Sequence, residues 1–317
     1  MQNILRNTPA HGSSPWLTLI ITIGYVFAGL FAFQFVGLAF ALPFYNFDWQ
    51  LTLQNVATNP LGDTGNRVPL LILQGVVAGG TFVGVPWLVI RRHLKLEVKE
   101  FFTFDKNYEP LLLVFAIVFT FMGVNSLFID WNMNIQLPES MRAMEVLMQD
   151  MEEQLKLLTE HLIVFDSFGH FLLGLAVIAV LPGIGEELLF RGLFQNIFHK
   201  AFGNPHVAIW LAAIIFGVFH FQFYGLVPRI LLGALFGYLY YYSGHLGYAM
   251  FAHFVNNGSM ILVAYLSQLG IINFDMTTMD QSPEIWAVGL FAVLTTLLFV
   301  RFYRYFKNQK NGLAENI

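Results

Sequence analysis

Two adjacent carboxylates and a guanidinium interrupt a strongly apolar stretch of the chain. Glu186, Glu187 and Arg191 lie in the segment LAVIAVLPGIGEELLFRGLFQNIF. Charged side chains in hydrocarbon are costly, and they persist only when they face a bundle interior, pair with one another or line a wet cavity. These three residues are therefore candidates for a functional site.

Their spacing divides the chemistry between the two glutamates. On an α-helix, Glu187 and Arg191 are four residues apart and share a face, so they can form an internal ion pair. Glu186 is turned away from Glu187 by about 100° around the helix axis. Glu186 is then a free carboxylate aimed at a cavity, where it can act as a general base towards water.

Two histidines in other apolar segments can complete such a site. His220 follows Phe216 by four residues in IIFGVFHFQF, and His253 precedes Asn257 by four in AMFAHFVNNG. A glutamate and two histidines can hold a water, with or without a metal ion, and an asparagine amide can donate to an oxyanion. Glu186, His220 and His253 are candidate ligands for a divalent metal such as Zn²⁺. No HExxH pair is present, so the sequence leaves metal binding open.

The composition places these residues in a membrane. The chain has 317 residues, of which 56% are hydrophobic and 11% charged, and its mean hydropathy is +0.62. Soluble domains carry about 25% charged residues. Apolar runs of about 20 residues predict an all-α, polytopic membrane bundle. The absence of cysteine excludes disulfides, thiolate ligands and a cysteine nucleophile.

Eight apolar spans are predicted, at 16–43, 68–90, 109–129, 164–198, 206–223, 226–243, 245–267 and 284–304. The fourth is too long for a simple span and contains Pro182, Gly183 and Gly185. One kinked helix, two successive helices and two antiparallel helices all fit it, and the last would make nine spans. In the sixth, Gly233 and Gly237 form a small-residue face that predicts close helix packing.

The placement of cations favours eight spans with both termini in the cytoplasm. This arrangement puts 11 of the 16 Lys and Arg residues inside: Arg6, Arg91, Arg92, Lys95, Lys99, Lys106, Lys200, Arg301, Arg304, Lys307 and Lys310. Arg67, Arg142, Lys156 and Arg229 fall outside. The first 15 residues have no basic region followed by a short apolar core, so we expect a short soluble tail and not a cleaved signal. The absence of targeting signals fits a bacterial inner membrane.

One segment outside the spans has its own pattern. In residues 138–162, apolar side chains recur at helical spacing with acidic residues between them. This pattern predicts an extramembrane amphipathic helix that lies on the outer surface or caps the bundle, and a packed loop-helix is favoured over a substrate gate. No fixed-period repeat is present. We therefore expect a single membrane domain, 1–317, with its motif-bearing core at about 164–267.

The three motifs together resemble those of a known family. EELLFR resembles EExxxR, FGVFH resembles FxxxH and HFVNN resembles HxxxN of the CPBP family, the CAAX prenyl protease and bacteriocin-processing intramembrane proteases. The motifs occur in the family's order, each on its own span. The resemblance implies an eight-helix fold like that of CAAX prenyl protease 2.

The resemblance also implies a reaction. Glu186 would activate a water with the help of His220, and His253 and Asn257 would polarise the scissile carbonyl and stabilise the oxyanion. The remaining motif residues would support the site: Glu187, Arg191 and Phe216. The family has been described both as metalloproteases and as glutamate-dependent enzymes, and the second description is favoured here.

The expected partners are membrane lipids and a peptide or lipidated protein at the membrane surface, and not nucleic acid. Two other classes of function compete with the endopeptidase. One is a non-catalytic scaffold or bacteriocin-immunity protein, although a binder has no need of an acid, two imidazoles and an amide in an apolar interior. The other is a proton-coupled transporter, but the region around EELLFR is not duplicated in the chain.

Overall fold

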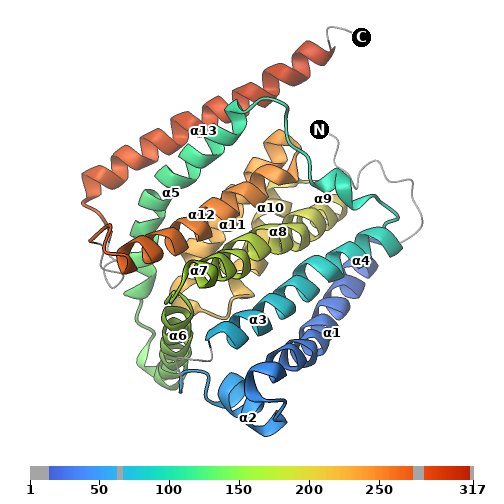
Figure 1. Ribbon diagram of the computed structural model, residues 1–317. Helices are drawn as coiled ribbons and strands as arrows, with labels where there is room; N and C mark the ends of the chain where they lie inside the picture. The colour runs from blue at the N-terminus through green and yellow to red at the C-terminus, as the bar shows by residue number, and fades with distance from the viewer. Residues whose placement is uncertain (1–13, 63–66, 274–281, 315–317) are drawn as a thin grey trace.

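The computed structural model describes residues 14–62, 67–273 and 282–314, and every regular element in these ranges is helical (Figure 1). Seven helical segments are long and apolar enough to cross a membrane. They are Pro15–Tyr45, Arg67–Arg92, Glu109–Met133, Phe168–Phe202, Phe223–Ser243, Leu246–Gln268 and Ile285–Gln309. The predicted polytopic helical bundle is confirmed. The two chain ends, including most of the predicted N-terminal tail, lie outside the described residues.

The remaining predicted span is the short helix α10, Pro205–Val218. Its 14 residues cover about 21 Å at 1.5 Å per residue, less than the hydrocarbon thickness of about 30 Å. The chain leaves the helix after Val218 and turns at Phe219 and His220. His220 therefore lies on a turn at the end of a shortened helix, and not within a full span.

Each of the other spans combines one or more helical elements. The first two contain α1 (Pro15–Ala41) and η1 (Leu42–Tyr45), then α3 (Arg67–Ala78), η4 (Gly79–Gly84) and α4 (Val85–Arg92). The later ones contain α5 (Glu109–Met133), η9 (Phe223–Gly225) with α11 (Leu226–Ser243), α12 (Leu246–Gln268) and α13 (Ile285–Ala314). Three short elements, α2 (Trp49–Leu53), η2 (Gln54–Thr58) and η5 (Val98–Phe101), lie in connections.

The long fourth segment is one uninterrupted run of helix. It passes through α7 (Phe168–Leu175), η7 (Ala176–Val180), α8 (Leu181–Glu187), η8 (Leu188–Gln195) and α9 (Asn196–Phe202). The arrangement as two antiparallel helices is therefore wrong, and the single crossing is correct. Both η7 and η8 are π-helical, and Pro182 occupies the first turn of α8 between them. Wider π turns accommodate a proline that a regular α-helix would not.

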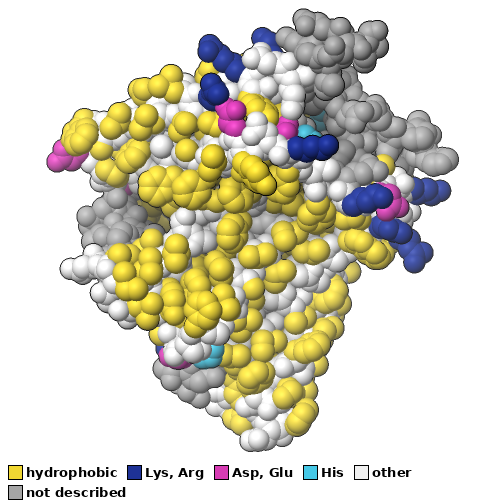
Figure 2. Space-filling model, turned by 45° about the horizontal axis from the view of Figure 1, so that its top comes forward, with side chains coloured by type: hydrophobic (Ala, Val, Ile, Leu, Met, Phe, Trp, Pro, Cys, Tyr) yellow, Lys and Arg dark blue, Asp and Glu magenta, His cyan; other side chains and the backbone are white. Residues whose placement is uncertain are grey.

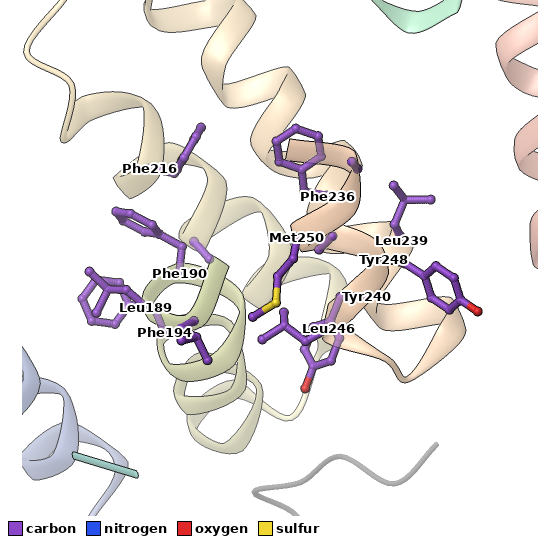
Figure 3. Close-up of a cluster of buried hydrophobic side chains, with 14 of the residues drawn as sticks. Leu189, Phe190, Phe194, Phe216, Phe236, Leu239, Tyr240, Leu246, Tyr248 and Met250 are labelled. Atoms are coloured by element: carbon purple, nitrogen blue, oxygen red, sulfur yellow. The ribbon is translucent and has the colours of Figure 1, made fainter. Parts of the chain in front are cut away.

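The core is built around η8. All eight of its residues are buried, because the segment packs against α10, α11, α12 and η4. Figure 3 shows aromatic and aliphatic side chains from these helices gathered into one cluster, among them Phe190, Phe216, Phe236 and Tyr248. Gly233 of α11 packs closely on α10, since a Cβ there would lie 3.1 Å from Ala213 Cα. The predicted small-residue packing is confirmed at this contact.

The two ends of the bundle differ in charge. Helices α4, α9 and α13 finish at one end, where α5 begins, and Arg301 of α13 pairs with Glu109 of α5 at 2.6 Å. Figure 2 shows Lys and Arg side chains gathered along this rim, beside a broad hydrophobic surface. The exposed cations of these elements and of the connection between α4 and α5 are Arg91, Arg92, Lys95, Lys99, Lys106, Lys200, Arg301, Arg304 and Lys307.

The opposite end carries the predicted extramembrane helix. Residues 138–162 contain η6 (Glu139–Met141) and α6 (Arg142–Leu162), which lies across that end of the bundle (Figure 1). The side of α6 that faces the bundle carries carboxylates. Glu145 is 2% exposed and accepts hydrogen bonds from Arg142 and from the backbone N–H of Leu137, while Leu147 is 59% exposed.

Candidate active site

A close approach between α8 and α12 places the two glutamates. A Cβ on Gly183 would lie 3.2 Å from both the Met250 carbonyl oxygen and the Phe254 backbone nitrogen of α12. Such contacts are tighter than a side chain normally makes, so glycine lets the two backbones meet. This contact sets the end of α8 beside the part of α12 that carries His253.

Glu187 is the centre of a buried polar cluster. Its Oε1 accepts a hydrogen bond from Arg191 Nη1 at 2.7 Å and lies 2.8 Å from His253 Nδ1. The side chains of Glu187 and Arg191 are fully buried. Arg191 also donates from Nη2 to the Gly233 carbonyl at 2.9 Å. The ion pair within EELLFR thus joins three helical segments, η8, α11 and α12.

Aromatic rings enclose this cluster. The guanidinium carbon of Arg191 lies 4.5 Å from the centre of the Phe216 ring and 5.5 Å from that of Phe236. The His253 ring stacks on Phe236 with centroids 5.2 Å apart and meets the edge of Phe216 at 5.9 Å. Phe216 also contacts the His220 ring at 4.9 Å. The first residue of the FxxxH motif therefore packs against a residue from each of the three motifs.

Glu186 points away from that cluster and towards His220. Its side chain is 16% exposed, and its Oε2 lies 3.9 Å from His220 Nε2. This oxygen is buried and, among the residues that the structure describes, has no hydrogen-bond partner. His220 Nδ1 lies 2.7 Å from the Phe216 carbonyl oxygen, which can only accept, so Nδ1 carries a proton. In neutral His220, the Nε2 atom that faces Glu186 is then an acceptor.

The backbone after His220 is strained. Phe221 has φ of +54°, a left-handed conformation that side-chain-bearing residues rarely adopt. Such residues are held in place by their surroundings and cluster at functional sites. Here the left-handed residue directly follows His220, after the turn that ends α10, and leads the chain into η9. This leaves the His220 ring beside Glu186.

Asn257 hydrogen-bonds to the backbone of the fourth span. Its Nδ2 donates to the Ile178 carbonyl at 3.0 Å, and its Oδ1 accepts from Asn256 at 3.0 Å. Pro182 lies four residues after Ile178 and has no N–H, so it cannot supply the usual helical donor to that carbonyl. Asn257 therefore ties α12 to the backbone of η7, one helical turn from His253.

The predicted metal ligands do not form a metal site. In residues 14–62, 67–273 and 282–314, no group of three or more His, Asp or Glu side chains is placed to hold a metal ion. Glu186 and His220 face each other, whereas His253 is directed at Glu187 through Nδ1. The designation as a metalloprotease is not supported by this arrangement.

Sequence reasoning missed other polar residues of the site. Gln195 Nε2 donates to the Gly237 carbonyl at 3.2 Å, and Asn196 Nδ2 donates to the Tyr240 hydroxyl at 3.0 Å. Together with the bond from Arg191 to Gly233, these bonds join one face of the fourth span to successive positions of α11. A buried amide in an apolar run was the signal that could have identified them. Nothing in the sequence indicated Glu152 of α6 and Arg229 of α11, which meet near His220 only in the fold.

Residues 168–259 match the family model described as type II CAAX prenyl endopeptidase, Rce1-like. This segment of the chain is similar to the Rce1-like family. The Rce1-like segment begins with α7 and ends two residues beyond Asn257, so it contains all three motifs. The resemblance to the CAAX prenyl protease group is confirmed over this segment.

One curated relative is an uncharacterised protein of Bacillus subtilis, YpbD. It is 29% identical to this chain over 82 residues, which are 25% of this chain and 39% of YpbD. The match thus spans about two fifths of the length of that relative. No solved structure matches the chain.

Proposed function

We propose that this protein is an intramembrane endopeptidase of the Rce1-like type. Its substrate would be a membrane-associated or lipidated protein or peptide. The observation that supports this most directly is the buried, unpartnered Glu186 carboxylate oxygen 3.9 Å from His220 Nε2. Two acceptors that face each other at this separation need a donor between them, and a water molecule can donate to both.

In the proposed reaction, Glu186 takes a proton from that water while the water oxygen attacks the scissile carbonyl carbon. His220 accepts the second hydrogen bond of the water and orients its lone pair. The tetrahedral intermediate then collapses, the carbon–nitrogen bond breaks, and the leaving amine takes the proton that Glu186 removed from water, which restores the carboxylate. No step in this sequence passes through a metal ion.

The neighbouring residues would hold this pair in position. Glu187 and Arg191 neutralise each other, and Glu187 fixes the ring of His253. Oxyanion stabilisation by His253 and Asn257 stays a prediction. With Nδ1 donating to Glu187, His253 can donate from Nε2 only when it is protonated, and Asn257 has one amide hydrogen left after its bond to Ile178.

A reconstituted cleavage assay tests the function. The purified protein would be placed in phospholipid vesicles with a quenched-fluorescent farnesylated peptide that ends in a CAAX sequence. Glu186→Gln and His220→Ala should abolish turnover while the protein stays folded. Glu153→Gln on the exposed side of α6 is the matched control and should cleave normally. Normal turnover by Glu186→Gln would show that the base is assigned wrongly.

The charge asymmetry of the two ends supports an orientation. We propose a bacterial inner membrane with both termini cytoplasmic, because cations favour the cytoplasmic side. The site then lies towards the outer side, since the turn that carries His220 is near α6. Gln222, two residues after His220, donates to Glu152 of α6 at 2.9 Å.

A further inference from the structure

A second arginine, half-buried, lies beside the site and outside the three motifs. Arg229 is in the first turn of α11, and its Nη2 donates to the side-chain oxygen of Gln222. The guanidinium lies directly against Gly225, where an added Cβ would collide with Nη1. Arg229 lies one helical turn before Gly233 on the same face of α11, and the Gly233 carbonyl accepts from Arg191. Its charge interacts with Glu152 of α6 first and then with Glu186. It is therefore a cation next to the proposed catalytic pair.

Arg229 differs from Arg191 in how its donors are used. Arg191 is bonded to the Glu187 carboxylate and to the Gly233 carbonyl. For Arg229, Gln222 is the one hydrogen-bond acceptor within the described part of the chain. A guanidinium has five N–H donors in a planar fork. Most donors of Arg229 therefore stay available to a substrate.

The proposed hydrolysis moves negative charge to a place that a cation must stabilise. Glu186 loses its charge when it takes the proton from water, and the same charge appears on the former carbonyl oxygen. Preorganised donors aimed at developing charge contribute strongly to catalysis in sites with little water. The negative charge moves from Glu186 to the oxyanion, so the total charge of the site is unchanged. A cation that lies near Glu186 before this step can therefore interact with the oxyanion after it.

We propose that Arg229 is a further catalytic residue, which donates hydrogen bonds to the oxyanion of the tetrahedral intermediate. This inference rests on the endopeptidase function proposed above. In the step concerned, the water oxygen bonds to the carbonyl carbon, its proton passes to Glu186, and the carbonyl π pair moves to the oxygen that Arg229 contacts. Arg229 keeps its charge throughout.

Helix α6 helps to hold Arg229 in position. Gln222 bonds Arg229 through its side-chain oxygen and Glu152 of α6 through its side-chain nitrogen. Gln149 of α6 also donates to the hydroxyl of Tyr224 at 3.2 Å. The extramembrane helix is thus fastened to the loop between His220 and α11, and it fixes the acceptor that orients the guanidinium.

The vesicle assay with the farnesylated CAAX peptide tests the role of Arg229. Arg229→Gln should lower kcat about 100-fold and leave KM within about twofold, because the interaction forms only in the transition state. Its thermal unfolding should stay close to that of the wild type. The kcat of Arg229→Lys should lie between those of the wild type and Arg229→Gln, since lysine keeps the charge but lacks the planar fork of donors. Arg304→Gln, an exposed arginine at the opposite end, is the control and should be fully active.

Gly225→Ala provides an independent perturbation that keeps the charge. Its Cβ would displace the guanidinium, so kcat should fall while the arginine remains. An unchanged kcat in folded Arg229→Gln, or a loss confined to KM, overturns the proposal. If Arg229→Gln does not fold, an unchanged kcat in Gly225→Ala overturns it. If the wild type is no faster than Glu186→Gln, the endopeptidase function itself fails.

Discussion

The structure pairs His253 with Glu187, the second glutamate of EELLFR. His253 Nδ1 lies 2.8 Å from Glu187 Oε1, the same oxygen that accepts from Arg191 at 2.7 Å. Glu186, one residue earlier, faces His220 across 3.9 Å. Two adjacent carboxylates thus have different surroundings: Glu187 Oε1 is bonded on two sides, and Glu186 Oε2 has no hydrogen-bond partner among the described residues.

This contrast predicts opposite effects of the same substitution. Glu187→Ala should lower the free energy of unfolding by about 3–5 kcal/mol, because it leaves Arg191 as a buried charge without its carboxylate. Glu186→Ala should change stability little, since its buried Oε2 has no hydrogen-bond partner among the residues that the structure describes. Thermal unfolding of the two purified proteins in detergent checks this. Equal melting temperatures would contradict the assignment of Glu187 as the structural carboxylate.

The contact at Gly183 predicts that a single methyl group disturbs the site. Gly183→Ala should push α8 away from α12 and cost about 1–3 kcal/mol of stability, as overpacking does. Turnover should fall as well, because Glu186 lies on the displaced helix. Gly289→Ala is the matched control, since no atom lies within 4 Å of a Cβ built there. Equal melting temperatures and equal turnover for Gly183→Ala and Gly289→Ala would show that the close approach at Gly183 is not needed for stability or activity.

The arrangement of ligands predicts insensitivity to chelators. Because Glu186, His220 and His253 do not converge as a metal-binding group, cleavage in vesicles should continue after treatment with EDTA and 1,10-phenanthroline. The measurement is turnover of the farnesylated peptide before and after dialysis against each chelator. If a chelator abolished activity and added Zn²⁺ restored it, Glu186 and His220 would need a metal ion for the reaction.

The charge asymmetry predicts which end is reached from outside the cell. The chain contains no cysteine, so single introduced cysteines can be labelled without background. In intact bacteria, Leu147→Cys on α6 should react with a membrane-impermeant maleimide, and Arg304→Cys should react only after lysis. Both side chains are exposed, so differences in labelling report sidedness and not burial. The reverse labelling pattern would invert the proposed orientation.

Patterns repeated along the chain were sufficient to predict the spans and the ion pair. Hydrophobic runs locate every membrane segment, because a bilayer demands long apolar helices. The pairing of Glu187 with Arg191 follows from a separation of four residues. The sequence did not decide the form of the fourth span, because Pro182, Gly183 and Gly185 also suit a break. The two π-helical segments that keep it continuous have no simple sequence signal.

Contacts between segments that are distant in the sequence could not be predicted from such patterns. The sequence grouped His253 with Glu186 and His220, whereas the structure places its Nδ1 on Glu187. The register of α12 against α8 at Gly183 decides this. Asn257 of α12 bonds to the Ile178 carbonyl of η7, a relation visible only across two helices. Arg229 and Glu152, 77 residues apart in the chain, meet near His220 through Gln222.

The residue types and their periodicity by themselves determined a membrane bundle with an acid, two imidazoles and an amide on separate spans. They did so because the cost of charge in hydrocarbon is a local property that each segment carries alone. Only the tertiary structure decided which acid is open, which imidazole faces it and which further cation lies beside them. These choices depend on angstrom-scale helix packing, to which residues from every part of the fold contribute.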